Sequence, residues 1–218
     1  TNGWLLTEKI IAELTAAGVN QIQISCNYPD QRQDDERGIP GLFEKLATFL
    51  PEMVRKGYDN LSIGTFLCAE NLDCVVELAR TVKGWGCKHS FNTYSRLKND
   101  NQKHVLPPEL IEKARQAVEE LIDIKHQNRN SLTSDQYLRT IPVFFEEGQR
   151  AGCIAGDKFL YVDQQGYIKQ CPELPPIAHI SRLEEVRTEP VSCGLCWYAC
   201  RGEHQTKITP QRVMELLR

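Results

Sequence analysis

The sequence lacks the long apolar run that a membrane span requires. No stretch of its 218 residues approaches the roughly 20 consecutive apolar residues that cross a bilayer. It also lacks a block of Lys or Arg, and its 26 basic and 29 acidic residues leave a net charge of -3. Without a basic surface to neutralise phosphates, no nucleic acid is expected as a partner. The sequence therefore predicts neither a membrane protein nor a nucleic-acid-binding protein.

A signal-peptide pattern is also missing, and no initiator Met precedes Thr1-Asn2-Gly3. We therefore expect a cytoplasmic protein, in a reducing compartment where disulfides are rare. Asn-Gly favours the positive φ of a tight turn, so the opening residues are typical of the exit from a strand. The chain is accordingly predicted to be the trailing part of a longer protein.

Cysteine, in contrast, is abundant, with nine residues. Because this number is odd, the cysteines cannot all be paired in disulfides. The early cysteines lie among apolar neighbours and are interpreted as core residues: Cys26, Cys68, Cys74 and Cys87. The other five crowd the last third of the chain: Cys153, Cys171, Cys193, Cys196 and Cys200. In a reducing compartment such crowding indicates a metal site more than disulfides.

Strand-like and helix-like segments alternate up to about residue 126. Apolar residues recur at helical spacing over 6–17, 42–53, 75–82 and 110–121, and strand-like runs occupy 21–26, 61–67 and 89–93. Strands joined by helix-length crossovers form a parallel sheet, with functional loops at the carboxyl ends of the strands. Three strand–helix units are too few to close a barrel. The sequence therefore predicts an α/β protein whose residues 1–126 form part of a (β/α) barrel of parallel strands.

Two features of this region bear on ligand binding. The predicted loop Asn27–Gly41 is longer than most βα connections and carries charged residues at 34–37. These charges either meet a ligand at the strand ends or are simply solvated. In the preceding strand, Gln21, Gln23 and Ser25 share one face. If that face points inward the barrel interior is a ligand site; the alternative is that it faces outward.

The remainder of the chain divides into a helical connector, 127–150, and a small cysteine-rich unit, 151–218. Strand-like runs at 158–163 and 167–171 flank a turn at Gly166, where a positive φ is expected. They predict a β-hairpin that brings the cysteines before and after it to one end.

The tail cysteines are the strongest functional signal in the sequence. Cys153 and Cys171 flank the predicted hairpin, and Cys193, Cys196 and Cys200 follow with two and three intervening residues. A Cys-x-x-Cys spacing lets two thiolates bind one metal centre. An iron–sulfur cluster and the zinc of a zinc ribbon both fit this pattern. A dithiol redox pair at Cys193 and Cys196 fits less well, because such a pair normally opens a helix after a strand.

Several segments, taken in order, carry a family resemblance: Thr1-Asn2-Gly3, Ile24-Ser25, Asp34–Gly38 leading into Gly41-Leu42-Phe43, and Leu61–Leu67 leading to Asn71. Together they resemble the second half of a radical S-adenosylmethionine (SAM) enzyme. The tail resembles the auxiliary-cluster extension of that superfamily, the SPASM or shorter twitch domain. That extension opens with a cysteine, a gap and then Gly-x-x-x-x-Cys, which Cys153, Gly166 and Cys171 match.

The resemblance implies an enzyme in which SAM, bound to a reduced [4Fe–4S] cluster, yields a 5′-deoxyadenosyl radical that takes a hydrogen atom from a small-molecule or peptide substrate. It implies that Ser25 contacts SAM and that Arg37 binds the methionine carboxylate. Cys153, Cys171 and two of the three later cysteines would hold one auxiliary [4Fe–4S] cluster, which binds substrate or carries an electron. A reductase, or a flavodoxin- or ferredoxin-type protein, would donate electrons.

Two departures from the family pattern matter. The Cys-x-x-x-Cys-x-x-Cys segment that holds the SAM-cleaving cluster is absent, so this chain alone is not expected to cleave SAM. The tail also has fewer cysteines than a full SPASM array, enough for one cluster, and His204 stands where a further cysteine could follow Cys200. The alternative function is an α/β binding module that carries a zinc ribbon for protein contacts.

Overall fold

The computed structural model describes residues 1–97, 101–128 and 130–216. The helices are α1 (Glu8–Ala16), α2 (Arg32–Arg37), α3 (Leu42–Arg55), η1 (Ala69–Asn71), α4 (Val75–Trp85), η2 (Pro108–Leu110), α5 (Ile111–Asn128), α6 (Asp135–Glu147), η3 (Ile180–Glu185), α7 (Ala199–Gln205) and α8 (Pro210–Leu216). The strands are β1 (Ile22–Ser25), β2 (Leu61–Leu67), β3 (Lys88–Thr93), β4 (Tyr161–Val162), β5 (Tyr167–Lys169) and β6 (Pro176–His179). Within the described ranges, no helix combines the length and apolar composition that a membrane crossing demands.

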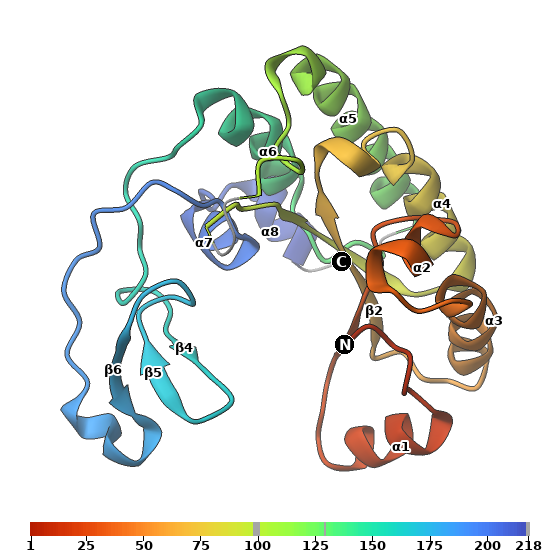
Figure 1. Ribbon diagram of the computed structural model, residues 1–218, viewed down its shortest axis with the longest axis horizontal. Helices are drawn as coiled ribbons and strands as arrows, with labels where there is room; N and C mark the ends of the chain where they lie inside the picture. Colours follow the sequence, from red (N-terminus) through yellow and green to blue (C-terminus); the bar gives the residue numbers. More distant parts are fainter. Residues whose placement is uncertain (98–100, 129, 217–218) are drawn as a thin grey trace.

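Strands β1, β2 and β3 form a parallel sheet in that order. The register places Ile24 opposite Ile63 and Ile63 opposite His89, so the carboxyl ends of the strands lie at the same edge. Helices α3, α4 and α5 lie along one face of this sheet (Figure 1). The predicted α/β class is thereby confirmed, and closure into part of a barrel stays a prediction.

The two faces of the parallel sheet differ in polarity. On the helix-covered face, Ile24 and Ile63 are fully buried in one apolar cluster with Leu46 of α3. On the open face, Nε2 of Gln23 donates a hydrogen bond to Oγ of Ser90 at 2.5 Å. The polar face of β1 is therefore the face that the helices leave free.

The outer edge of β1 is occupied by the first residue. The backbone nitrogen of Thr1 donates to the carbonyl of Gln23 at 3.1 Å, and the backbone nitrogen of Ser25 donates to the carbonyl of Thr1 at 2.9 Å. These two bonds flank Ile24 in the way that a parallel neighbour strand does. Thr1 thus continues the hydrogen bonding of the sheet beyond β1.

The segment Asn27–Gly41, predicted as a loop, contains the short helix α2. One of its charged residues has a structural role. The carboxylate of Asp34 accepts hydrogen bonds from the backbone nitrogens of Gly41 and Phe43, each at 2.7 Å. Asp34 therefore caps the start of α3 from outside the helix. This role differs from both alternatives considered from the sequence, a ligand contact and a solvated charge.

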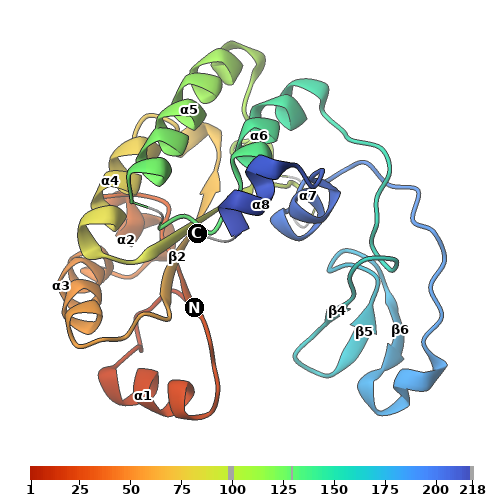
Figure 2. The same ribbon diagram turned by 180° about the vertical axis from the view of Figure 1, so that it is seen from behind.

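The tail holds a second, antiparallel sheet. Strands β4 and β5 pair with Val162 opposite Ile168, and β6, which the sequence did not predict, adds to β5. This small sheet stands across from the open face of the parallel sheet in both views (Figures 1 and 2). The assignment of 151–218 to an auxiliary-cluster domain stays a prediction.

The predicted helical connector is joined to the core by hydrogen bonds. A single helix, α6, runs through Pro142 in this segment. The hydroxyl of Tyr137, a fully buried residue of α6, donates to the carbonyl of Trp197 at 2.7 Å. The backbone nitrogen of Ala199 donates to Oδ1 of Asn92 at 2.9 Å, so α7 is joined to β3 as well.

Candidate functional site

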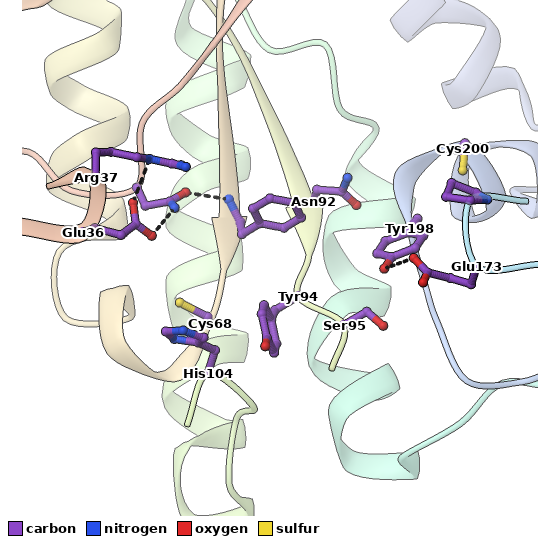
Figure 3. A pocket seen from close by; sticks show the side chains of 13 residues that line it. Glu36, Arg37, Cys68, Asn92, Tyr94, Ser95, His104, Glu173, Tyr198 and Cys200 are labelled. Carbon is purple, nitrogen blue, oxygen red and sulfur yellow. Dashed lines mark hydrogen bonds and ion pairs between the residues drawn. The ribbon is translucent and has the colours of Figure 1, made fainter. Parts of the chain in front are cut away.

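The carboxyl ends of the parallel strands open onto a cavity of about 710 Å³, here called the strand-end cavity. Its lining comes from the ends of β2 and β3, from the segments after β1, β2 and β3, and from the tail: Asn27, Glu36, Arg37, Phe66, Cys68, Asn92, Tyr94, Ser95, His104, Pro172, Glu173, Tyr198 and Cys200 (Figure 3). Ligand sites of α/β sheets form at this edge, and the volume falls within the ~300–1,000 Å³ typical of small-molecule pockets. The position and size therefore fit a ligand site.

Arg37, at the end of α2, lines this cavity. Its Nε atom is buried and makes no hydrogen bond, although Oε2 of Glu36 lies 3.3 Å away. The other carboxylate oxygen, Oε1 of Glu36, accepts from Nδ2 of Asn27 at 2.7 Å. A guanidinium with an unsatisfied buried N–H is a suitable partner for an anionic ligand, because Arg binds carboxylates through several donors at once.

Ser25, the other residue predicted to contact SAM, ends β1 opposite Gly64 and is half-buried. Its carbonyl accepts a hydrogen bond from Nε2 of Gln33 at 3.4 Å. Ser25 is not among the described residues that line the strand-end cavity. The structure therefore brings Arg37 to this cavity and leaves Ser25 outside its lining.

All of the predicted metal ligands line a second cavity of about 230 Å³, here called the cysteine cavity. These are Cys153, Cys171, Cys193, Cys196 and Cys200, and all of them are free thiols. They come from the loop before β4, the segment after β5, the long segment before α7 and the first turn of α7. The structure thus gathers residues that are widely separated in the sequence.

The electrostatics of these thiols reflect their crowding. Burial raises the pKa of Cys171, Cys196 and Cys200, and the nearby thiol of Cys153 raises each of these pKa values further. Backbone N–H groups act in the opposite direction, as at Cys196, where the N–H of Tyr198 lowers the pKa. A cationic metal centre would lower the pKa of these thiols, because the thiolate is the form that binds a metal.

Arg201 was not identified from the sequence, although it lies in the lining of the cysteine cavity and is only 1% exposed. Its guanidinium donates to neutral acceptors, among them the carbonyls of Cys196 at 2.8 Å and Ala151 at 2.9 Å. A buried charge is stable only when it is compensated. Ionised thiols in this cavity would supply the compensating negative charge.

The two cavities share a wall. Pro172, Glu173, Tyr198 and Cys200 line both of them, and the hydroxyl of Tyr198 donates to Oε1 of Glu173 at 3.2 Å (Figure 3). A group bound by the cysteines would therefore lie next to a ligand in the strand-end cavity. His204 is exposed on α7, and it is not among the described residues that line either cavity.

The fold and these two cavities define an α/β protein with a ligand-sized cavity beside a cavity lined by thiols. No protein-family profile matches the chain. It is 26% identical over 203 residues to the AdoMet-dependent heme synthase of Methanosarcina barkeri (strain Fusaro / DSM 804). The match covers 86% of this chain and 58% of that protein, so the chain spans less than two thirds of its relative. The relative's name states a dependence on SAM, the cosubstrate that the resemblance implies.

Proposed function

We propose that this chain is the carboxyl-terminal portion of a radical SAM enzyme and holds one auxiliary [4Fe–4S] cluster. The observation that carries the proposal is the convergence of five cysteines on one cavity that shares a wall with the strand-end cavity. The similarity to an AdoMet-dependent enzyme supports it independently.

In this proposal Cys153, Cys171 and two of the three later cysteines ligate the cluster. The backbone N–H groups directed at Cys171 and Cys196 stabilise the thiolates, and such bonds to sulfur also tune a cluster's reduction potential. Arg201 offsets part of the negative charge of the thiolates. Because Cys200 faces both cavities, the cluster would lie within reach of the substrate.

Arg37 binds the methionine carboxylate of SAM in the strand-end cavity, using the Nε–H group that makes no hydrogen bond in this structure. Ser25 contacts SAM from the end of β1. When bound to its own cluster, SAM supplies the 5′-deoxyadenosyl radical that takes a hydrogen atom from the substrate. The cysteine triad for that cluster is not in this sequence, so its ligands belong to a preceding segment.

The iron content tests this proposal. After anaerobic reconstitution with iron and sulfide, we expect about four irons per chain and a broad absorbance near ~400 nm, as one cubane cluster gives. Replacing Cys171 by Ser should remove a ligand and most of the iron. The matched control is Cys74→Ser, which alters a buried thiol of the α/β part and should leave the iron content unchanged.

A colourless chain that instead binds zinc in stoichiometric amounts would contradict the cluster. It would favour the alternative function, a zinc-bearing module for protein contacts. Full iron in the Cys171→Ser variant would show that the ligand assignment is wrong. A reductase, flavodoxin or ferredoxin as electron donor stays a prediction.

For the substrate we infer a tetrapyrrole, since the relative is named a heme synthase. The strand-end cavity offers the aromatic walls of Phe66 and Tyr94 for a flat macrocycle. Haemin added to the chain should shift its Soret band on binding, and Phe66→Asp should weaken binding at least about tenfold. Leu132→Asp alters a similarly exposed apolar residue that does not line the cavity and serves as control. Equal affinities in all three proteins would rule out this assignment.

A further inference from the structure

A cluster of three potential metal ligands lies in the wall of the strand-end cavity, apart from the tail cysteines. The sulfur of Cys68, a carboxylate oxygen of Glu70 and a ring nitrogen of His104 all lie within 4.8 Å of one another. Figure 3 shows the Cys68 sulfur beside the His104 ring, across the cavity from Cys200. From the sequence, Cys68 was expected to be a core residue, so this convergence is new.

The backbone brings these ligands together. Cys68 directly follows β2, and Glu70 lies in the single turn η1. His104 arrives from the segment after β3, where its carbonyl accepts a hydrogen bond from the backbone nitrogen of Ala69 at 3.2 Å. The main chains of the two segments are thus joined at the cluster, so the positions of the ligands do not depend on flexible side chains alone.

A buried amide fixes the turn that carries two of the ligands. Asn71 is fully buried, and its Oδ1 accepts from the backbone nitrogen of Cys68 at 3.1 Å. Its Nδ2 donates to the carbonyl of Phe66 at 2.7 Å. The rings of His104 and Tyr94 form a T-shaped pair, with 5.0 Å between ring centroids. Partners of this kind, which orient ligands from behind, are typical of metal sites.

The carboxylate of Glu70 is half satisfied. Its Oε1 pairs with Nζ of Lys103 at 2.5 Å. Its Oε2 is buried and forms an ion pair with Nδ1 of His104, but it accepts no hydrogen bond. A buried carboxylate oxygen without a hydrogen bond is costly. A cation held between the thiol, the imidazole and this oxygen would satisfy all three groups.

We propose that Cys68, Glu70 and His104 bind a divalent first-row transition metal ion, with zinc as the probe ion. One thiolate, one imidazole and one carboxylate form a donor set that suits such ions. Three protein ligands leave a fourth tetrahedral position open, as in sites that bind a substrate or water. Cys68 and His104 both line the strand-end cavity, so the open position faces a ligand bound there. An oxygen or nitrogen donor of that ligand would complete the coordination.

Zinc binding to the iron-reconstituted chain tests this site. Equilibrium dialysis should find one zinc per chain that is absent from the Cys68→Ser variant. X-ray absorption at the zinc edge should show one sulfur and otherwise nitrogen or oxygen ligands. Loss of a single residue that hydrogen-bonds to a metal ligand lowers metal affinity about 10–100-fold. Loss of a ligand itself should therefore lower the affinity for zinc by at least about 100-fold. His104→Gln should have the same effect without altering a buried thiol.

The matched control is Cys74→Ser, a second buried cysteine of the α/β part, which should bind zinc like the unmodified chain. If the tail binds zinc instead of iron, Cys68→Ser still lowers the number of zinc ions per chain by one. Failure of the tail proposal can therefore be distinguished from failure of the Cys68 site. Unchanged zinc binding in both Cys68→Ser and His104→Gln would overturn this site. Zinc surrounded only by sulfur in the unmodified chain would overturn it too.

Discussion

His89 shows how burial at a single residue sets a pH response. It lies inside the parallel sheet, 3% exposed, with its ring centroid 4.1 Å from that of Phe91 and its Nε2 2.9 Å from Oγ1 of Thr65. Burial lowers the pKa of His89 from 6.5 to about 3. The folded chain therefore keeps this ring neutral in a range where the unfolded chain protonates it.

This difference predicts an acid-sensitive stability. Below pH 6.5 the unfolded chain binds a proton that the folded chain does not, so the free energy of unfolding falls as the pH drops toward 3. The contribution of His89 to this loss of unfolding free energy should reach about 2 kcal/mol at pH 5. Denaturant titrations at pH 7 and at pH 5 measure the free energy of unfolding. The loss of this free energy between the two pH values should be smaller by about 2 kcal/mol in His89→Gln than in the unmodified chain. An identical pH dependence in both proteins would mean that His89 is not the responsible group.

The placement of individual residues was predictable where its signal is local. The convergence of the tail cysteines on one cavity could be expected from their spacing, because a Cys-x-x-Cys pair can face a single point. Arg201 could not, since its role depends on burial beside the cysteine cavity. The meeting of His104 with Cys68 could not either, because one backbone hydrogen bond between distant segments creates it.

At the scale of elements, the contact between α6 and α7 depends on one glycine. A Cβ atom at Gly202 of α7 would overlap the ring of Tyr137 in α6. The absence of a side chain therefore lets the helix that carries Cys200 approach the core closely.

We expect Gly202→Ala to destabilise the chain by about 1–3 kcal/mol, because the overlap forces the helices apart. The control is Gly84→Ala in α4, where a Cβ atom meets nothing within 4 Å and alanine should stabilise the helix by roughly 0.5–1 kcal/mol. Thermal melts of both variants measure the difference. Equal melting temperatures would show that α7 can shift without cost.

The periodic elements were predictable, and two short elements without an apolar period were not. Apolar spacing located α3, α4 and the three parallel strands, because each buries a continuous face. Helix α2 escaped prediction since Arg32–Arg37 is entirely polar, and its neighbour Gly38 ends it in a left-handed conformation. Strand β6 escaped because it opens with Pro176, which is typical of edge strands and turns.

On the scale of the whole molecule, the tail and the α/β part share a core. Trp197 is 5% exposed and belongs to the same apolar cluster as Tyr137 and residues of α4 and α5. Its indole nitrogen donates to Oγ1 of Thr140 at 2.7 Å. The predicted boundary near residue 150 therefore crosses a region of continuous packing.

A chain cut after residue 150 should consequently lose stability. It would lack the side chain of Trp197, whose removal alone is worth about 3–5 kcal/mol, and one of the acceptors for the Tyr137 hydroxyl. Chemical denaturation followed by far-ultraviolet circular dichroism should give a clearly lower midpoint than for the full chain. A midpoint equal to that of the full chain would instead identify 1–150 as an independent folding unit.

The cysteine cavity has one more consequence, for the entropy of the unfolded chain. Its first and last thiols, Cys153 and Cys200, lie far apart in the sequence but line the same small space. A cluster held by both would cross-link the chain much as a disulfide does. Closing a loop of that length lowers the entropy of the unfolded chain by an amount worth about 4 kcal/mol. Loading of the cavity and ordering of the tail would then be a single equilibrium, so that the supply of iron sets how much of the chain is folded.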